Sequence, residues 1–219
     1  MSCQIIIFGG IIRTVNGPKI IYEDESIIVV DKPAGTLVIP TPKNETYTLT
    51  YLLNRQLDSR GVKINAYPCH RLDRQTSGVI VYAKGKKIQK IMMGKFKERK
   101  IRKHYLAFVH GHLNKKAGTI SHPIENRRAV TKYVVLKQKE SFSVVEVKPI
   151  TGRTNQIRIH FKTIGHPLLG ERKFAFAKDY KLKFRRAALH AERIEFTHPV
   201  TNEFLSFSSP LPEDMKRLL

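Results

Sequence analysis

One carboxylate of this sequence stands in surroundings that suit chemistry. Asp73 lies among cationic side chains, small hydroxyls and a glycine, in the run Cys69-His70-Arg71-Leu72-Asp73-Arg74-Gln75-Thr76-Ser77-Gly78. An ionised carboxylate in a loop can act as a nucleophile or as a general base. The structural alternative is an aspartate that shapes a turn or caps a helix, and without further motifs this alternative is preferred.

The segments after Asp73 predict a rigid support for it. Residues 79–82 are a short apolar run, which predicts a strand and places Asp73 in the loop that leads into a sheet. Residues 86–97 carry apolar side chains at helical intervals and predict a helix that buries them. These side chains are Ile88, Ile91, Met92 and Phe96.

Further runs rich in β-branched and aromatic residues predict strands, and turn residues separate several of them. The runs are 26–31, 105–109, 132–136, 143–147, 188–196 and 203–207. The last two flank a strong turn cluster and predict a hairpin. The mixture of strands and helices predicts an α+β fold with a mixed sheet.

Two more helices are expected. Leucines at helical spacing predict one over residues 48–57, with Thr48 as its N-cap. The other begins after Thr151, stops at Gly165 and carries Arg158 in its first turns. Its apolar face is expected to hold Ile157, Phe161 and Ile164.

The charge of the chain predicts a polyanionic partner. Lys and Arg total 40 against 18 Asp and Glu, a formal net charge of +22. Such an excess is typical of proteins held to nucleic acid by phosphate contacts and counterion release. A merely basic surface and an anionic membrane are the alternatives, but no long basic amphipathic segment stands out.

The N-terminal segment and the cysteines indicate the compartment. The apolar stretch 5–12 is too short to span a bilayer and lacks a clear cleavage site, so it is interpreted as a packed arm. A transit peptide is the alternative, although the segment carries few arginines and serines. Cys3 and Cys69 form no CxxC pair, which fits a reducing compartment. A cytoplasmic monomer that does not bind a membrane is expected.

Several segments resemble, in order, the motifs of one family. The sequence from His70 to Lys84 resembles HRLDxxTSGxxxxAK, the signature of the RluA family of RNA pseudouridine synthases. Segments similar to the family's DKPxG, KxYxAxVxG, GRTHQIRxH, GxPxxGD and LHA motifs follow the same order along the chain. They lie at residues 31–35, 102–111, 152–160, 165–171 and 189–191, so that the resemblance covers roughly residues 21–199.

Three positions depart from the family pattern. Asn155 stands where the family usually has His, Glu171 where Asp is common, and Phe174 where Tyr is frequent. None of the three is expected to touch the proposed reactive groups. The implied activity is therefore kept, whereas the substrate of a close relative cannot be transferred to this chain.

The resemblance implies a pseudouridine-synthase-like fold: a mixed, mainly antiparallel sheet with flanking helices and a central active-site cleft. It implies an N-terminal arm at residues 1–20 and a catalytic domain at residues 21–219. Many relatives carry an additional N-terminal S4 RNA-binding domain, for which the residues before the synthase-like region are too few. We therefore expect the catalytic domain to find its RNA alone, which favours a compact stem-loop of transfer or ribosomal RNA.

The implied reaction isomerises specific uridines to pseudouridine. The glycosidic bond from N1 to C1′ breaks, the enclosed uracil rotates, and C5 is joined to C1′ of the same ribose. Neither a redox change nor group donation occurs, so no cofactor and no metal are expected. The absence of a Walker phosphate loop and of a GxGxxG fingerprint from the sequence agrees with this expectation.

The family positions imply three catalytic residues. Asp73 would attack C1′ or remove the C2′ proton, two routes that the sequence does not separate. Arg158 would keep this carboxylate charged through two parallel hydrogen bonds, although by itself it could be a solvated helix residue. Tyr105 would lie against uracil with its hydroxyl toward the C5 proton, although strand tyrosines most often only pack.

The substrate-binding residues follow from the same resemblance. The target uridine must be flipped out of its stack or taken from a loop to reach a buried carboxylate. Arg71 would occupy the space that the extruded base leaves, and His70 and Leu72 would shape the catalytic loop. Leu189 would form the apolar floor of the pocket, although by itself it indicates only a core position.

Two basic tracts are expected to supply most contacts with the RNA backbone. The first holds Lys95, Lys97, Arg99, Lys100, Arg102 and Lys103, and the second holds Arg172, Lys173, Lys178, Lys181, Lys183, Arg185 and Arg186. Aromatic residues in the second tract could stack on bases or anchor the segment to the core. They are Phe174, Phe176, Tyr180 and Phe184.

Other functions remain as alternatives. A basic RNA-binding or RNA-folding protein could use the same scaffold without catalysis, and an RNA-editing or methylating enzyme would need a metal or donor site that the sequence does not show. Several histidines suggest a metal site, but no acidic or cysteine ligand completes a recognisable spacing. These histidines are His104, His110, His112 and His122.

Overall fold

A computed structural model describes residues 5–8, 11–14, 17–43, 45–174 and 184–219 of the 219-residue chain. Its elements, in chain order, are β1 (Ile5–Phe8), β2 (Ile11–Thr14), β3 (Lys19–Glu23), β4 (Ile27–Lys32), α1 (Leu49–Ser59), β5 (Ala66–Pro68), β6 (Ser77–Lys84), α2 (Lys86–Lys97), β7 (Arg102–His110), β8 (Ala117–Ile120), β9 (Thr131–Gln138), β10 (Phe142–Pro149), α3 (Gln156–Thr163), β11 (Leu189–Thr197), β12 (Phe204–Ser208) and α4 (Glu213–Lys216).

One ten-stranded sheet holds most of the strands. Its order is β3-β4-β6-β11-β7-β10-β9-β8, with β5 paired to β6 and β12 paired to β11. All of these pairs are antiparallel except β6 with β11, which run parallel where Ser77 meets His190 and Gly78 meets Ala191. The α+β class and the mixed, mainly antiparallel sheet are therefore confirmed.

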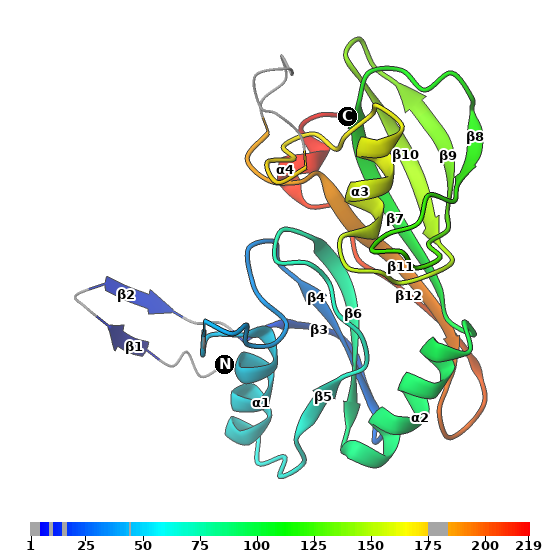
Figure 1. Cartoon of the computed structure of the whole chain (residues 1–219). Helices are drawn as coiled ribbons and strands as arrows, with labels where there is room; N and C mark the ends of the chain where they lie inside the picture. The colour runs from blue at the N-terminus through cyan, green and yellow to red at the C-terminus, as the bar shows by residue number, and fades with distance from the viewer. Residues whose placement is uncertain (1–4, 9–10, 15–16, 44, 175–183) are drawn as a thin grey trace.

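The parallel pair joins two halves of the molecule (Figure 1). β3 to β6 lie with α1 and α2 on one side of it, and β7 to β10 lie with α3 on the other. Gly78 has a φ of +115°, and a Cβ at this position would lie 2.1 Å from the carbonyl oxygen of Ala191. Only glycine lets β6 approach β11 so closely, directly after the loop that carries Asp73.

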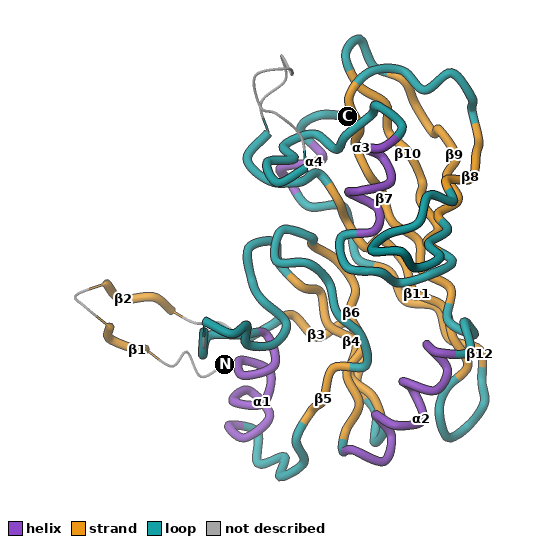
Figure 2. The backbone as a smooth tube through the Cα atoms, in the orientation of Figure 1, coloured by secondary structure: helices purple, strands orange, loops and turns teal. Residues whose placement is uncertain are grey.

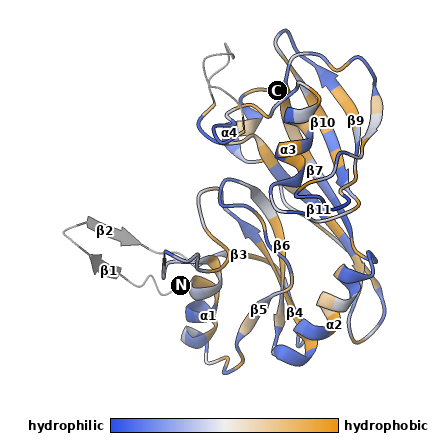
Figure 3. Cartoon of the chain, in the orientation of Figure 1, coloured by the Kyte–Doolittle hydropathy of each residue, from blue (hydrophilic) through white to orange (hydrophobic). Residues whose placement is uncertain are grey.

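α1 and α2 begin where the sequence predicts, whereas α3 begins only at Gln156 and the short α4 was not predicted. The hydroxyl of Thr48 accepts a hydrogen bond from the backbone N–H of Tyr51 at 3.2 Å and so caps α1. Hydrophobic residues are concentrated along the strands and the inner helix faces (Figure 3). Two expected core positions are wrong, because Ile91 on α2 and Ile164 at the C-cap of α3 are both exposed.

The N-terminal segment pairs with itself. β1 and β2 form a separate two-stranded antiparallel sheet. Residues 5–12 were expected to form a packed arm, and how their side chains pack lies outside the described residues. Among the residues that the structure describes, no helix is long and apolar enough to cross a membrane.

Candidate active site

A cleft of about 1300 Å³ opens beside the junction of the two halves. Drug-sized ligands occupy pockets of roughly 300–1000 Å³, so this cleft has room for a segment of a larger substrate. Two of the segments that line it, from β5 to β6 and from β10 to α3, are loops (Figure 2). The cleft brings together every site residue expected from the sequence, namely His70, Arg71, Leu72, Asp73, Tyr105, Arg158 and Leu189.

The loop that carries Asp73 is held through its backbone. The fully buried Lys32 donates hydrogen bonds to the carbonyl oxygens of Thr76 at 2.7 Å and Arg74 at 3.2 Å, and to that of Pro33 at 3.1 Å. On the far side of the loop, Arg186 donates to the carbonyl oxygen of Gln75 at 3.1 Å. The sequence analysis recognised the DKPxG motif that contains Lys32. Nothing in the sequence indicated that the Lys32 ammonium holds the Asp73 loop.

Among the described residues, the carboxylate of Asp73 has one ionic neighbour. Its Oδ2 lies 3.6 Å from Nη1 of Arg158, and its side chain is 28% exposed, toward the cleft. Among the described residues it accepts no hydrogen bond shorter than this contact, so it caps no helix and closes no turn. The turn is made by the backbone instead, where the N–H of Thr76 donates to the carbonyl oxygen of Asp73.

Arg158 makes its two parallel hydrogen bonds with Glu171 rather than with Asp73. Its Nε and Nη2 lie 2.7 and 2.8 Å from the two carboxylate oxygens of Glu171, which is fully buried. Burial opposes the charge on Glu171, but the bonds from Arg158 and from backbone N–H groups outweigh burial and lower its pKa. The expectation of a bidentate Asp73–Arg158 pair was wrong, and so was the alternative of a solvated Arg158.

The three departures from the family pattern all touch Arg158. Glu171 forms the bidentate pair, Asn155 accepts a hydrogen bond from Nη1 at 2.8 Å, and the ring of Phe174 lies 5.2 Å from the guanidinium carbon. The expectation that none of them touches a proposed reactive group was therefore wrong. Asn155 lies three residues before Arg158, at the start of α3, whereas the chain that follows α3 brings residues 171 and 174 to the same side chain.

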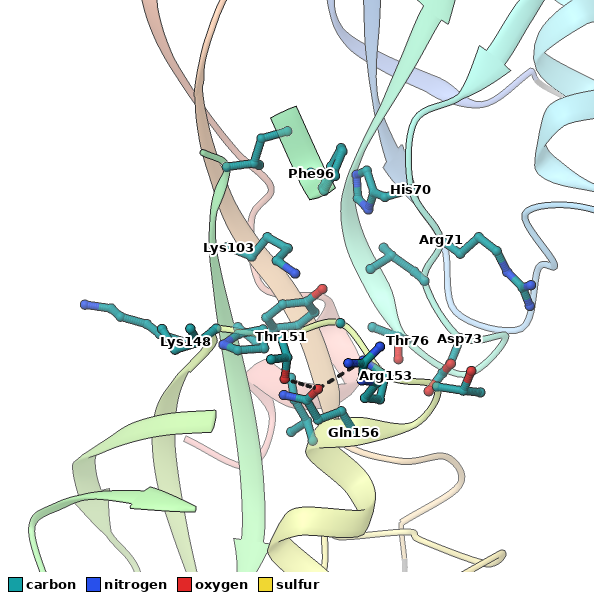
Figure 4. A pocket seen from close by; sticks show the side chains of 18 of the residues that line it. His70, Arg71, Asp73, Thr76, Phe96, Lys103, Lys148, Thr151, Arg153 and Gln156 are labelled. Atoms are coloured by element: carbon teal, nitrogen blue, oxygen red, sulfur yellow. Dashed lines mark hydrogen bonds between the residues drawn. The ribbon is translucent and has the colours of Figure 1, made fainter. Parts of the chain in front are cut away.

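The start of α3 is fixed by a buried amide. Oε1 of Gln156 accepts hydrogen bonds from the hydroxyl of Thr151 at 2.6 Å and from the N–H of Arg153 at 3.0 Å (Figure 4). Its Nε2 donates a hydrogen bond to the carbonyl oxygen of Val130 at 3.0 Å. Asn155 has a φ of +54° and uses its side chain on Arg158, so it gives α3 no side-chain cap. The Gln156 amide instead ties the segment before α3 to the sheet.

Tyr105 and Leu189 lie on neighbouring strands and close the cleft from one side. Both are almost fully buried, and β7 pairs with β11 at Ala107 and Leu189. Burial, followed by the negative charge of Asp73, raises the pKa of the Tyr105 phenol. The phenol is therefore neutral at physiological pH and sits near enough to Asp73 to sense its charge.

His70 and Arg71 occupy different surroundings. The ring of His70 packs against Phe96 with centroids 4.8 Å apart, and its Nε2 accepts the N–H of Val81 at 3.2 Å. Burial, followed by the charge on Lys103, lowers the pKa of His70 to about 3, so the imidazole is neutral. Arg71 is exposed and extends away from the Asp73 carboxylate (Figure 4).

The second basic tract is only partly a surface feature. Arg186 is buried, pairs with Asp214 at 2.7 Å and bonds backbone carbonyls, so its expected contact with RNA was wrong. Residues 175–183, with Phe176, Lys178, Tyr180, Lys181 and Lys183, lie outside the described residues.

Within the described part of the chain, no three His, Cys, Asp or Glu side chains group as metal ligands.

Comparisons with known proteins match this chain to one family. Residues 26–163 match the model of the RNA pseudouridylate synthases. The chain is 37% identical to the dual-specificity RNA pseudouridine synthase RluA of Haemophilus influenzae, over 87% of this chain and 91% of that one. It is 36% identical to the ribosomal large subunit pseudouridine synthase D of Nitrosomonas europaea, over 92% of this chain and 64% of that one.

The same family appears among solved structures. Human RNA pseudouridylate synthase domain containing 1 superposes with a TM-score of 0.74 at 27% identity, covering 89% of this chain and 83% of that one. The fold, the cleft and the sequence matches agree with one another. The chain belongs to the RluA family of RNA pseudouridine synthases, enzymes that isomerise uridine in RNA to pseudouridine.

Proposed function

We propose that Asp73 is the reactive carboxylate of this synthase, that Arg158 is its ion partner and that Tyr105 packs against the target uracil. The observation that carries this proposal is the position of Asp73 in the cleft. Its carboxylate faces the cavity, has a cation 3.6 Å away and is otherwise free of side-chain hydrogen bonds among the described residues. A carboxylate held in this way is available to a substrate.

The reaction needs a carboxylate at the sugar. Asp73 either attacks C1′ and displaces N1, or removes the C2′ proton so that a glycal forms. In both routes uracil stays enclosed and rotates. In the first, C5 forms its bond to C1′ as the bond from C1′ to Asp73 breaks; in the second, C5 adds to C1′ of the glycal while Asp73 returns the proton to C2′. The C5 proton then leaves and N1 gains a proton, so the product is an isomer of the substrate and no co-reactant is consumed.

The partners of Asp73 divide this work. Arg158 supplies positive charge, but its two parallel hydrogen bonds go to Glu171. The Asp73 oxygens are therefore free to move toward the sugar. Tyr105 is a neutral phenol and hence a weak base, so its first role is to give uracil a flat surface. Leu189 and Leu72 are buried beside the same space and exclude water from it.

The substrate is structured RNA with a uridine that can leave its stack. Flipping a base costs on the order of a few kcal/mol, and least where the base is already unpaired. A stem-loop of transfer or ribosomal RNA meets this requirement, and the name of the Nitrosomonas relative makes ribosomal RNA the first to examine. A cytoplasmic location and a monomeric state stay predictions, as does the role of Arg71 in holding the flipped conformation.

The test begins with mapping of pseudouridine in RNA from cells with and without the gene. An RNA that loses a pseudouridine is then transcribed and treated with the wild-type protein and with Asp73→Asn. We expect Asp73→Asn to lower kcat by about 10⁴-fold, because it removes the reactive charge, while RNA affinity is unchanged. Asp58→Asn, on the exposed last turn of α1, is the matched control and should retain full activity.

Two outcomes contradict the proposal. Full turnover by Asp73→Asn would remove this residue from the chemistry. An unchanged pseudouridine map, together with intact RNA binding by Asp73→Asn, would favour the alternative of a basic RNA-binding protein on a synthase scaffold.

A further inference from the structure

Lys103, a partly buried cation inside the cleft, has no counter-charge among the described residues. Lys103 lies on β7 two residues before Tyr105, and because side chains alternate along a strand, the two share the face that lines the cleft. Figure 4 shows the Lys103 side chain extending from its strand into the cleft, toward the wall that carries His70. Its Nζ lies 3.7 Å from the point where a Cβ on Gly152 would sit, beside the loop that leads into α3.

Three other cations that line the cleft are already paired. Arg158 bonds Glu171, Lys148 lies 3.3 Å from Glu146, and Arg102 lies 4.0 Å from Glu195. Among the described residues, Lys103 has neither a hydrogen-bond acceptor nor a carboxylate within reach. Desolvation by the surrounding protein lowers the pKa of its ammonium.

The cleft itself offers no further anion. Nine Lys or Arg side chains line it within the described residues, against only two carboxylates, Asp73 and Glu195. Asp73 lies beside Arg158, and Glu195 is surrounded by Arg193, His104 and Arg102. A half-buried ammonium without an acceptor in the protein is unfavourable, and a ligand that brings negative charge into the cleft would satisfy it.

We propose that Lys103 binds a phosphate group that flanks the uridine in the cleft. The inference rests on the proposed function, since it needs uracil to lie against Tyr105. Two residues on one face of a strand are roughly 7 Å apart, a distance that one nucleotide bridges from base to phosphate. An ammonium is a compact point charge with freely rotating donors, which suits a phosphate whose orientation changes while the base rotates.

The first measurement is the salt dependence of RNA binding. Lys103→Met keeps the length of the side chain and removes the charge, and all binding is measured in the Asp73→Asn background so that no turnover occurs. Loss of one phosphate contact should make the slope of log K against log salt less steep by about 0.7 to 0.9 and weaken binding about tenfold at moderate salt. Lys103→Arg should keep the wild-type slope, and Lys87→Met, exposed on α2 and away from the cleft, should change neither quantity.

The second measurement identifies the group that Lys103 contacts. The target RNA is synthesised with a neutral methylphosphonate at the linkage 5′ or 3′ of the target uridine. At one of the two linkages, the methylphosphonate should weaken RNA binding by the protein that keeps Lys103. It should not weaken RNA binding by Lys103→Met any further. Equal losses with both proteins at both linkages would overturn the proposal and point to another contact, such as a uracil carbonyl.

The controls separate the possible failures. Because Lys103 is desolvated and unpaired, Lys103→Met should melt at the same temperature as the parent protein or higher, and a lower melting temperature with an unchanged salt slope would assign it a structural role instead. If the parent protein with Asp73 isomerises the RNA, but the salt slope of RNA binding is the same with Lys103→Met as with Lys103, only this inference fails. If the parent protein isomerises no RNA, the proposed function fails and this inference fails with it.

Discussion

Two carboxylates lie on either side of Arg158, and the protein treats them in opposite ways. Glu171 accepts two hydrogen bonds from the guanidinium and further ones from the N–H groups of Lys173 and Phe174, and its side chain is fully buried. Asp73 has only the contact at 3.6 Å, and its side chain is 28% exposed. One carboxylate is saturated with donors, and the other is left under-bonded.

The surrounding backbone shows the reverse distribution. The loop of Asp73 is held by Lys32 and Arg186, which bond the carbonyl oxygens of residues 74–76 and leave the Asp73 side chain alone. The turn of Glu171 is held by the Glu171 side chain itself. A reactive group can be positioned through its backbone and still keep its oxygens free, whereas a positioning group uses up its side chain.

The largest effect in this comparison of the two carboxylates is expected from a change at Glu171. Glu171→Gln removes the charge that holds Arg158, and loss of one partner of a buried ion pair costs about 3–5 kcal/mol of unfolding free energy. We also expect kcat to fall about 100-fold, because a misdirected guanidinium no longer faces Asp73. KM should change much less, since Glu171 does not line the cleft. Urea unfolding and single-turnover kinetics measure the two effects.

A graded series sharpens this prediction. Glu171→Asp keeps the charge but shortens the side chain, so that it should retain one of its bonds with Arg158 and more activity than Glu171→Gln. Glu213→Gln, whose carboxylate on α4 is exposed and pairs with Lys216, should match the wild type in both measurements. Equal kcat values for Glu171→Gln and the wild type would show that Arg158 needs no second carboxylate.

The sequence predicted elements well where local rules decide the structure. The Thr48 cap, the helix over 86–97 and the strand after Gly78 depend on neighbours within a few residues, and each lies where it was expected. The gathering of Asp73, Tyr105 and Arg158 in one cleft also followed from family motifs. Composition and spacing alone did not bring these three side chains together.

The partners of Arg158 could not be predicted in this way. A run of residues gives no information about which of two carboxylates a guanidinium chooses, because the choice depends on the turn that brings Glu171 back over α3. Arg186 was misjudged for a similar reason. Its place in a basic tract suggested a side chain exposed to solvent. Instead it forms an ion pair with Asp214 on α4 and donates a hydrogen bond to the Gln75 carbonyl in the Asp73 loop.

A smaller effect is expected at Lys32. Lys32→Met removes the ammonium that bonds the Thr76 carbonyl and leaves the Arg74 carbonyl with only the N–H of Gly35. It should lower kcat about tenfold through a looser Asp73 loop, with RNA affinity unchanged. Burial, and then the charge on Arg186, lower the Lys32 pKa from its ordinary 10.5 to about 7. Between these pH values the unfolded chain therefore binds more protons at Lys32 than the folded protein.

The sign of the pH dependence follows from that difference. The free energy of unfolding of the wild type, relative to Lys32→Met, should rise with pH from about 7 toward about 10 and be lowest below this window. Urea unfolding at several pH values measures it, with the exposed Lys19→Met on β3 as the control. A difference that is flat with pH would mean that Lys32 keeps its proton in both states.

The smallest effect is expected at Tyr105, where the ring and the hydroxyl can be separated. Among the described residues the hydroxyl has no hydrogen-bond partner, so Tyr105→Phe should leave stability almost unchanged. If the ring is what uracil needs, kcat should fall by much less than the roughly 100-fold that loss of a general acid or base costs, and Tyr105→Leu should be the slower variant. Turnover of RNA with 5-deuterouridine tests the remaining role. An isotope effect that appears only in Tyr105→Phe would show that the hydroxyl handles the C5 proton, and the under-bonded Asp73 would then share the chemistry with a second residue.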